Sequence, residues 1–256
     1  MLDSLSTLAW MAGITNRLKL GTSVTVLPGR NPLLLAKQLA TIDRLSGGRM
    51  LPAVGLGRED PKELEALGVA KHLRGRLMDE TLLLVKRFLA EDHVTHDGEF
   101  YHVSDLSLRP KPAQKKMSLW VGGRGEAALR RTGRLGDGWL PAYVSPAEVA
   151  DGRERIAEYS SRAGRQIDSG HFGVIISYHL EKDVGPEYLE AVRARRPNLS
   201  LEEYTALGGT EVLTRLMERY IEAGASKFVL YPLAEPRDWS RELGLLSEEI
   251  LTVMQN

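Results

Sequence analysis

Short runs of apolar and β-branched residues alternate with longer helical segments along nearly the whole chain. Six such runs stand out, at residues 18–27, 50–54, 118–121, 138–141, 172–180 and 227–231. This alternation is typical of parallel β-strands, which need crossover helices because tight turns cannot join them. The sequence therefore predicts an α/β fold built on a parallel sheet.

The helices between these runs have recognisable ends. Asn31-Pro32 provides an N-cap followed by proline at the first helical position, and Gly47-Gly48 terminates that helix. Ser145 and Glu148 have the spacing of a capping box. Further helices are predicted over residues 4–13, 72–91, 186–195, 210–223 and 239–254.

One segment, "HVTHDGEFYHV" at residues 93–103, alternates with period two around Asp97-Gly98, which predicts a β-hairpin inserted before the third strand. Across such a turn His93 would pair with His102 while His96 points to the other face, so three ligands do not converge and no metal site is expected. With no linker or low-complexity tract, residues 1–256 are expected to form one domain that carries this hairpin.

The composition favours a small-molecule partner. Basic and acidic residues balance at 34 each, so no net positive charge would attract nucleic acid or an anionic membrane. The chain has no cysteine, which excludes disulfides and thiolate metal sites and suits a reducing compartment. No apolar run approaches the roughly 20 residues of a membrane helix. A soluble, cytoplasmic protein is expected.

Two glycine clusters follow predicted strands. The segment "GGRGEAA", residues 122–128, contains the G-x-G-x-x-A pattern of dinucleotide-binding turns. A Rossmann fold also needs an acidic residue at the end of the next strand, whereas Asp137 precedes that strand, so this interpretation is disfavoured. A phosphate-binding turn and a simple tight turn that requires glycine both remain open. The second cluster, residues 55–59, suggests that both strand ends meet at one mouth where a ligand lies against backbone.

Several longer segments occur together in one order. They include "LGTSVTVLPGRNPLLLAKQLATIDRLSGGRMLPAVGLG", "HDGEFYHV", "LRPKPAQ", "LWVGGRGEAALRRTGRLGDGWLPA" and "YIEAGASKFVL". In these segments the chain resembles the luciferase-like flavin oxidoreductases, and most closely the branch that uses the deazaflavin coenzyme F420. The resemblance implies a (β/α)8 TIM barrel with the flavin at the carboxyl-terminal mouth.

The resemblance also implies the residues of the cofactor site. In the family, the strand that matches residues 22–26 carries a bulge, often with a non-proline cis peptide, that supports the flavin ring. Ser23 and Val24 are accordingly expected beneath the ring, with Val26 close by, and the loop with Gly55 and Arg58 is expected to line the pocket. The backbone expected to hold the ribityl-phosphate end comprises Val121, Gly122, Gly123, Arg124, Gly125 and Glu126.

The sequence departs from the family in one respect. It offers about six barrel strands, and the family's first strand, first helix and second strand have no counterpart in it. Relatives that reduce F420 place a proton-handling histidine or acid at the end of that second strand, so no catalytic residue is assigned. Three explanations stay open: the sequence is an incomplete copy of a longer protein, a shortened protein whose gap a partner subunit covers, or an open barrel. Because an open barrel exposes strand edges, we expect a homodimer that covers the gap.

The expected function is that of an oxidoreductase that transfers hydride at the ring of F420, or alternatively of FMN, with an unknown small organic substrate. F420 is favoured over FMN by the resemblance alone. Two alternatives are an FMN-dependent monooxygenase and a non-catalytic flavin-binding protein with an incomplete barrel. A barrel enzyme that acts on a sugar phosphate is a weaker third.

Overall fold

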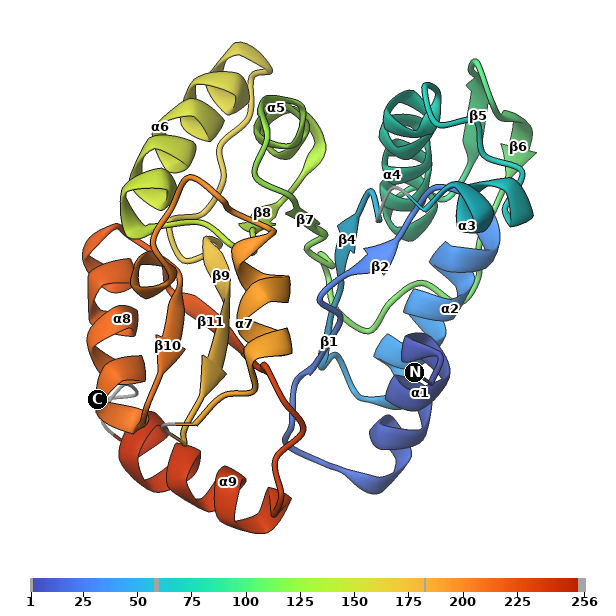
Figure 1. Ribbon diagram of the computed structural model, residues 1–256. Coiled ribbons are helices and arrows are strands. Elements are labelled where there is room, and N and C mark those ends of the chain that lie inside the picture. Colours follow the sequence, from blue (N-terminus) through green and yellow to red (C-terminus); the bar gives the residue numbers. More distant parts are fainter. Residues whose placement is uncertain (1, 58–59, 182, 253–256) are drawn as a thin grey trace. The chain divides into compact units, whose positions relative to one another are not determined.

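The computed structural model describes residues 2–57, 60–181 and 183–252 (Figure 1). The chain divides into two compact units. The first comprises Met1–Leu140 and Ile156–Ile167, and the second comprises Pro141–Arg155 and Asp168–Asn256. In the described ranges, no helix is long and apolar enough to cross a membrane.

The first unit is built on a four-stranded parallel sheet. Its strands, in the order β2-β4-β7-β8, are β2 (Thr25–Val26), β4 (Ala53–Gly55), β7 (Trp120–Gly122) and β8 (Gly138–Leu140). A second parallel pair, β1 (Leu20–Gly21) and β3 (Met50–Leu51), lies just upstream on the same two chain segments. The strand order follows the chain order, as expected for successive βα units.

Helices of the first unit supply its core. They are α1 (Ser4–Ile14), α2 (Pro32–Leu45), α3 (Pro61–Ala66), α4 (Arg74–Ala90) and α5 (Glu126–Leu135), and α6 (Pro146–Arg162) is divided between the units. Helix α2 buries Leu35, Leu39 and Ile42, three or four residues apart, as an amphipathic helix does. These residues belong to one apolar cluster with Val54 and Val121 of the sheet.

Two buried charged residues fix the chain before strand β3. Asp43 is fully buried, and its carboxylate accepts hydrogen bonds from the backbone amides of Ala113 (2.7 Å) and Gln114 (3.0 Å). Arg49 donates to the carbonyl oxygens of Thr15 (2.7 Å) and Leu18 (2.7 Å). These bonds tie the loop before β7 and the end of α1 to the start of β3.

Asp137 plays the same part before β8. Its buried carboxylate accepts a hydrogen bond from the Leu119 amide (3.1 Å) and forms ion pairs with Lys86 (2.9 Å) and Arg165 (3.2 Å). Burial lowers the pKa of Lys86, and the neighbouring Asp137 carboxylate opposes that shift. Asp137 therefore links α4, the start of β8 and the segment after α6.

An antiparallel hairpin, β5 (Val94–Asp97) and β6 (His102–Leu106), lies at the position of the predicted insertion, beside α4 (Figure 1). Its tip is held by Glu80, which accepts from the amides of Phe100 (3.0 Å) and Tyr101 (2.9 Å) and contacts His96 Nε2 (3.0 Å). The predicted pairing of His93 with His102 is wrong. The turn comprises residues 98–101 and not Asp97-Gly98, so His102 pairs with Asp97.

The second unit contains a three-stranded parallel sheet in the order β10-β9-β11. Its elements are β9 (Gly173–His179), α7 (Pro186–Arg193), the 3₁₀ turn η1 (Leu201–Glu203), β10 (Thr205–Leu207), α8 (Thr210–Glu222), β11 (Lys227–Pro232), α9 (Trp239–Leu245) and the π-helical turn η2 (Leu246–Leu251). The predicted capping box is present, since Ser145 N donates to the Glu148 carboxylate (2.8 Å) and Glu148 N donates to Ser145 Oγ (3.3 Å).

The predicted strands and helices need four corrections. The run at residues 18–27 forms two short strands, because the Thr22 side chain replaces the backbone there by hydrogen bonding to the Ala53 carbonyl (2.7 Å) and amide (2.9 Å). Strand β10 and helix α3 were not predicted, since both are too short to show a period. The predicted helix at residues 239–254 is α9 followed by a π-helical turn.

Candidate functional site

The carboxyl ends of four parallel strands form one edge of the sheet in the first unit. Val26 pairs with Gly55, and Gly122 pairs with Leu140. Val54 pairs with Val121, so Gly55 and Gly122 follow at adjacent positions on neighbouring strands. Both glycine clusters singled out in the sequence therefore start at the same sheet edge, as predicted.

The Val24 side chain occupies the space above these two glycines. A Cβ added at Gly55 would lie 2.4 Å from Val24 Cγ2, and one added at Gly122 would lie 3.1 Å from Val24 Cγ1. The peptide bond between Ser23 and Val24 is cis, as the family resemblance implies for this segment. Gly55 and Gly122 thus leave room for Val24, and this contact explains why both are glycine.

Val26 also packs against a glycine. Gly57 has a φ of 78°, and a Cβ there would lie 2.8 Å from Val26 Cγ1. Val24 and Val26 are both half-buried. Thr25 between them is buried and pairs with Val54, which in turn pairs with Val121. The two valines therefore form a small apolar platform on three glycines at the carboxyl edge of the sheet.

The turn from β7 into α5 lies at the same edge. Gly123 has a φ of 103°, which favours glycine, and its carbonyl accepts a hydrogen bond from Trp139 Nε1 (2.8 Å). Gly125 is the N-cap of α5, and among the described residues no side chain caps this helix. Residues 123–127 are exposed. The turn thus presents an accessible helix N-terminus, whose partial positive charge favours an anion.

Two charged side chains flank this N-terminus. Arg124 precedes the helix and is exposed, so a guanidinium stands next to the turn. Glu126 lies in the first turn of α5, where its negative charge stabilises the helix by interacting with the helix dipole. Its carboxylate accepts a hydrogen bond from the Tyr159 hydroxyl. The donor set of backbone amides plus one guanidinium suits a phosphate.

The sequence-predicted site residues fall into two groups on this edge. Ser23, Val24, Val26 and Gly55 belong to the platform, and Val121 to Glu126 form the strand end and the turn. Ser23 is exposed. Arg58 lies outside the described residues.

Two contributors were not among the site residues expected from the sequence: Trp139 holds the Gly123 carbonyl, and Tyr159 holds Glu126. Gly57 belongs to the second glycine cluster, but its contact with Val26 was not predicted. Trp139 follows the "GDG" of the family-like segment, which is the only local signal for it. Nothing near Tyr159 in the sequence indicates its contact.

Histidines do not form a metal centre in the part of the chain that the structure describes. No group of three possible ligands converges there. His93 and His102 instead contact single carboxylates, those of Asp105 (2.8 Å) and Asp97 (2.6 Å). His179, at the end of β9, is different, because its Nε2 is buried with no hydrogen-bond partner among the described residues.

Comparison with solved structures identifies the fold type. The chain aligns with an F420-dependent secondary alcohol dehydrogenase with a TM-score of 0.81 and 19% identity, over 98% of this chain and 84% of that one. It also aligns with the oxygenating constituent of 3,6-diketocamphane monooxygenase from Pseudomonas putida, which was solved with FMN, with a TM-score of 0.76 and 16% identity, over 97% of this chain and 83% of that one. These neighbours share the luciferase-like TIM-barrel architecture.

Sequence comparison identifies the family. An F420-dependent glucose-6-phosphate dehydrogenase of Kineococcus radiotolerans is 33% identical over 236 residues, which cover 87% of this chain and 67% of that protein. The family model for luciferase-like monooxygenases matches residues 1–227. The chain therefore belongs to the luciferase-like monooxygenase family.

Proposed function

We propose that the protein is an oxidoreductase that holds coenzyme F420 at the carboxyl edge of the sheet in its first unit and transfers hydride between that cofactor and a small organic substrate. The observation that carries this proposal is the joint placement, on one sheet edge, of an apolar platform and an exposed helix N-terminus that no side chain of the described residues caps. A flavin or deazaflavin has matching parts, namely a flat apolar ring and a phosphate.

The described residues fit such a group. Val24 and Val26 would lie against the ring, with Ser23 and Gly55 beside them. The amides of the exposed turn from Gly123 to Glu126 would face the phosphate, and Arg124 would add positive charge. Arg58 remains part of the proposed site on the family resemblance alone.

When bound, F420 or FMN supplies a ring that accepts or donates a hydride. The chain's own contribution is to position that ring and to exclude water from its lower face through the two valine side chains. The helix dipole of α5 and the backbone of the turn would fix the phosphate end. We assign no proton-handling residue among the described residues of the first unit.

F420 is chosen over FMN because the sequence relative with 33% identity carries F420 in its name. FMN remains the second candidate because a structural neighbour was solved with it. In that case the protein would be an FMN-dependent monooxygenase. A flavin-binding protein without turnover is the third candidate.

Cofactor binding separates these candidates. F420 and FMN are titrated separately into the purified protein, and quenching of cofactor fluorescence is recorded. We expect saturable F420 binding with one site per chain, and binding of neither cofactor would refute the proposal. If F420 binds, its reduction is then followed by absorbance with a panel of alcohols and sugar phosphates. No turnover with any of them would favour the non-catalytic alternative.

A homodimer is part of this proposal. Trp10 and Ile14 of α1 and Leu2 just before it are 64%, 57% and 81% exposed, which is unusual for large apolar side chains in one short segment. Light scattering at micromolar concentration should give the mass of two chains, and lysines at Trp10 and Ile14 should give one. A wild-type monomer would refute the dimer. A single barrel domain over residues 1–256 and a cytoplasmic location also stay predictions.

A further inference from the structure

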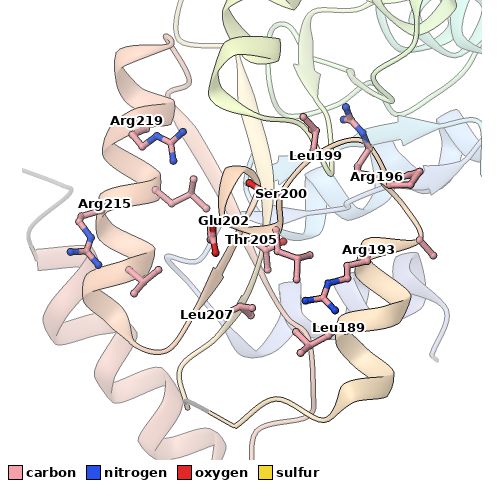
Figure 2. A pocket seen from close by; sticks show the side chains of 15 residues that line it. Leu189, Arg193, Arg196, Leu199, Ser200, Glu202, Thr205, Leu207, Arg215 and Arg219 are labelled. Atoms are coloured by element: carbon pink, nitrogen blue, oxygen red, sulfur yellow. The ribbon is translucent and has the colours of Figure 1, made fainter.

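The second unit contains a pocket that the proposed cofactor site does not use. Its volume is about 1050 Å³, which is enough for a small organic ligand. Figure 2 shows α8 with Arg215 and Arg219 on one side of it and α7 with Leu189 and Arg193 on the other. Every lining residue lies in the second unit, from α7, the segment after it, η1, β10 and α8.

The pocket wall is largely aliphatic. Six of its lining residues are Leu189, Leu199, Leu201, Leu207, Val212 and Leu216. Among the described residues that line it, none is aromatic. A wall of this kind favours an aliphatic body over a flat aromatic one, because it offers no ring for stacking.

Cationic side chains surround this wall. Arg193, Arg215 and Arg219 line the pocket, and within the described part of the chain none of them forms an ion pair. Arg196 also lines it, but its guanidinium is held by Glu148 (2.5 Å) and the Tyr143 carbonyl (2.6 Å). The one acidic residue of the described lining is Glu202, so the pocket has an excess of positive charge.

Thr205 of β10 belongs to the wall of the pocket and is only 2% exposed. Its Oγ1 is buried and has almost no accessible surface, so this hydroxyl is not counted among the ligand contacts.

We propose that this pocket binds a medium-chain aliphatic anion. The aliphatic wall would take the chain of the ligand, and the positive charge of Arg193 on α7 and of Arg215 and Arg219 on α8 would attract its charged end. Guanidinium groups bind carboxylates and phosphates through paired hydrogen bonds, so an acyl carboxylate and an alkyl phosphate share the required chemistry.

Isothermal titration of the full chain, without flavin, tests this proposal with four probes. Decanoate and decyl phosphate should each bind with one site per chain, and the tighter of the two identifies the preferred head group. 1-Decanol, which lacks the charge, should bind at least tenfold more weakly than decanoate. Inorganic phosphate, which lacks the chain, should not bind measurably. Equal affinities for decanoate and decanol, or several sites per chain, would overturn the proposal.

Charge-neutralising variants locate the site. Arg193→Gln and Arg215→Gln should each weaken decanoate binding about tenfold, which is the typical effect of losing one charged hydrogen bond, and leave decanol binding unchanged. Arg195→Gln is the matched control, because this residue lies near the end of the same helix but does not line the pocket. Thr205→Val is a second control, because a hydroxyl with almost no accessible surface does not reach the ligand. Equal decanoate affinity in all four variants would overturn the proposal whether or not F420 binds.

Discussion

A methyl group at residue 55 has no room beside Val24. In Gly55→Ala the new Cβ would lie 2.4 Å from Val24 Cγ2, a separation at which two carbon atoms repel strongly. Because Gly55 is buried in β4, the strain has to be relieved by a shift of Val24 or of the strand. Overpacking of this kind destabilises proteins by about 1–3 kcal/mol. We expect a loss of that size, and weaker F420 binding as Val24 is displaced.

Truncation of Val24 should remove the destabilisation that Gly55→Ala causes. In Val24→Ala the nearest atom to the new Cβ would be the Cβ of residue 24, at 3.5 Å, which is an ordinary van der Waals contact. Gly55→Ala in that background should therefore be neutral, or stabilising by up to about 1 kcal/mol because alanine restricts the unfolded chain. The double-mutant cycle should give a coupling free energy of about 1–3 kcal/mol.

Urea-induced unfolding followed by circular dichroism measures the four free energies of this cycle. Gly13→Ala is the matched control, because an added Cβ at this site in α1 meets no atom within 4 Å. It should be neutral or slightly stabilising. If the changes in unfolding free energy of Gly55→Ala and Val24→Ala add to within about 0.5 kcal/mol in the double variant, the proposed packing of Val24 against Gly55 is refuted.

Three further predictions concern the first unit. Trp139→Phe removes the donor to the Gly123 carbonyl, so we expect a loss of about 1–2 kcal/mol in urea unfolding and a higher F420 dissociation constant; unchanged values would contradict a role in holding the turn. Thr25→Val removes a buried hydroxyl that has no partner among the described residues, and it should raise the unfolding free energy by about 1 kcal/mol, whereas a clear loss would reveal a missed partner. Burial raises the pKa of Glu80, but hydrogen bonds from His96, Phe100 and Tyr101 outweigh it and hold the pKa below its ordinary value of 4.5. Its contribution to stability is therefore full above pH 4.5 and lost as the pH falls through the lower folded-state pKa, and Glu80→Gln should flatten this acid limb of the stability curve.

Features with local signals could be predicted from the sequence. Asn31 accepts hydrogen bonds from the first amides of α2, as its position before proline indicates. The Ser145–Glu148 capping box likewise marks the start of α6. The parallel pairing of the strands in the first unit followed from the alternation of strands and helices, because tight turns cannot join parallel strands.

The segments that resemble the family mostly secure the scaffold. Asp43 and Arg49 belong to "LAKQLATIDRLSGGR", and both bind backbone groups from distant segments before β3 begins. Asp137 belongs to "ALRRTGRLGDGW" and does the same before β8. These three residues precede strands β3 and β8, whereas the proposed cofactor site lies at the carboxyl ends of the strands. Because the segments that carry the resemblance mostly hold the scaffold, the family could be recognised although no catalytic residue was assigned.

Contacts between distant residues could not be predicted. Val24 covers Gly55 and Gly122, which are far from it in the sequence, and no periodicity reveals which side chain a glycine accommodates. Both glycines were taken as places where a ligand approaches backbone, and the structure gives each a neighbour within the protein. Only the turn at Gly123 to Glu126 keeps the exposed backbone that the phosphate hypothesis requires.

In the proposed function, the turn after β7 holds the phosphate end of F420. The most direct test of this placement is the F420 dissociation constant, measured by fluorescence quenching, of wild type, Gly123→Ala and Gly164→Ala. Both glycines have positive φ, 103° and 65°, so both variants strain the backbone, but only Gly123 belongs to the turn. We predict saturable wild-type binding that weakens at least tenfold in Gly123→Ala and stays unchanged in Gly164→Ala. Equal affinity in all three proteins, or no F420 binding by wild type, would contradict the claim.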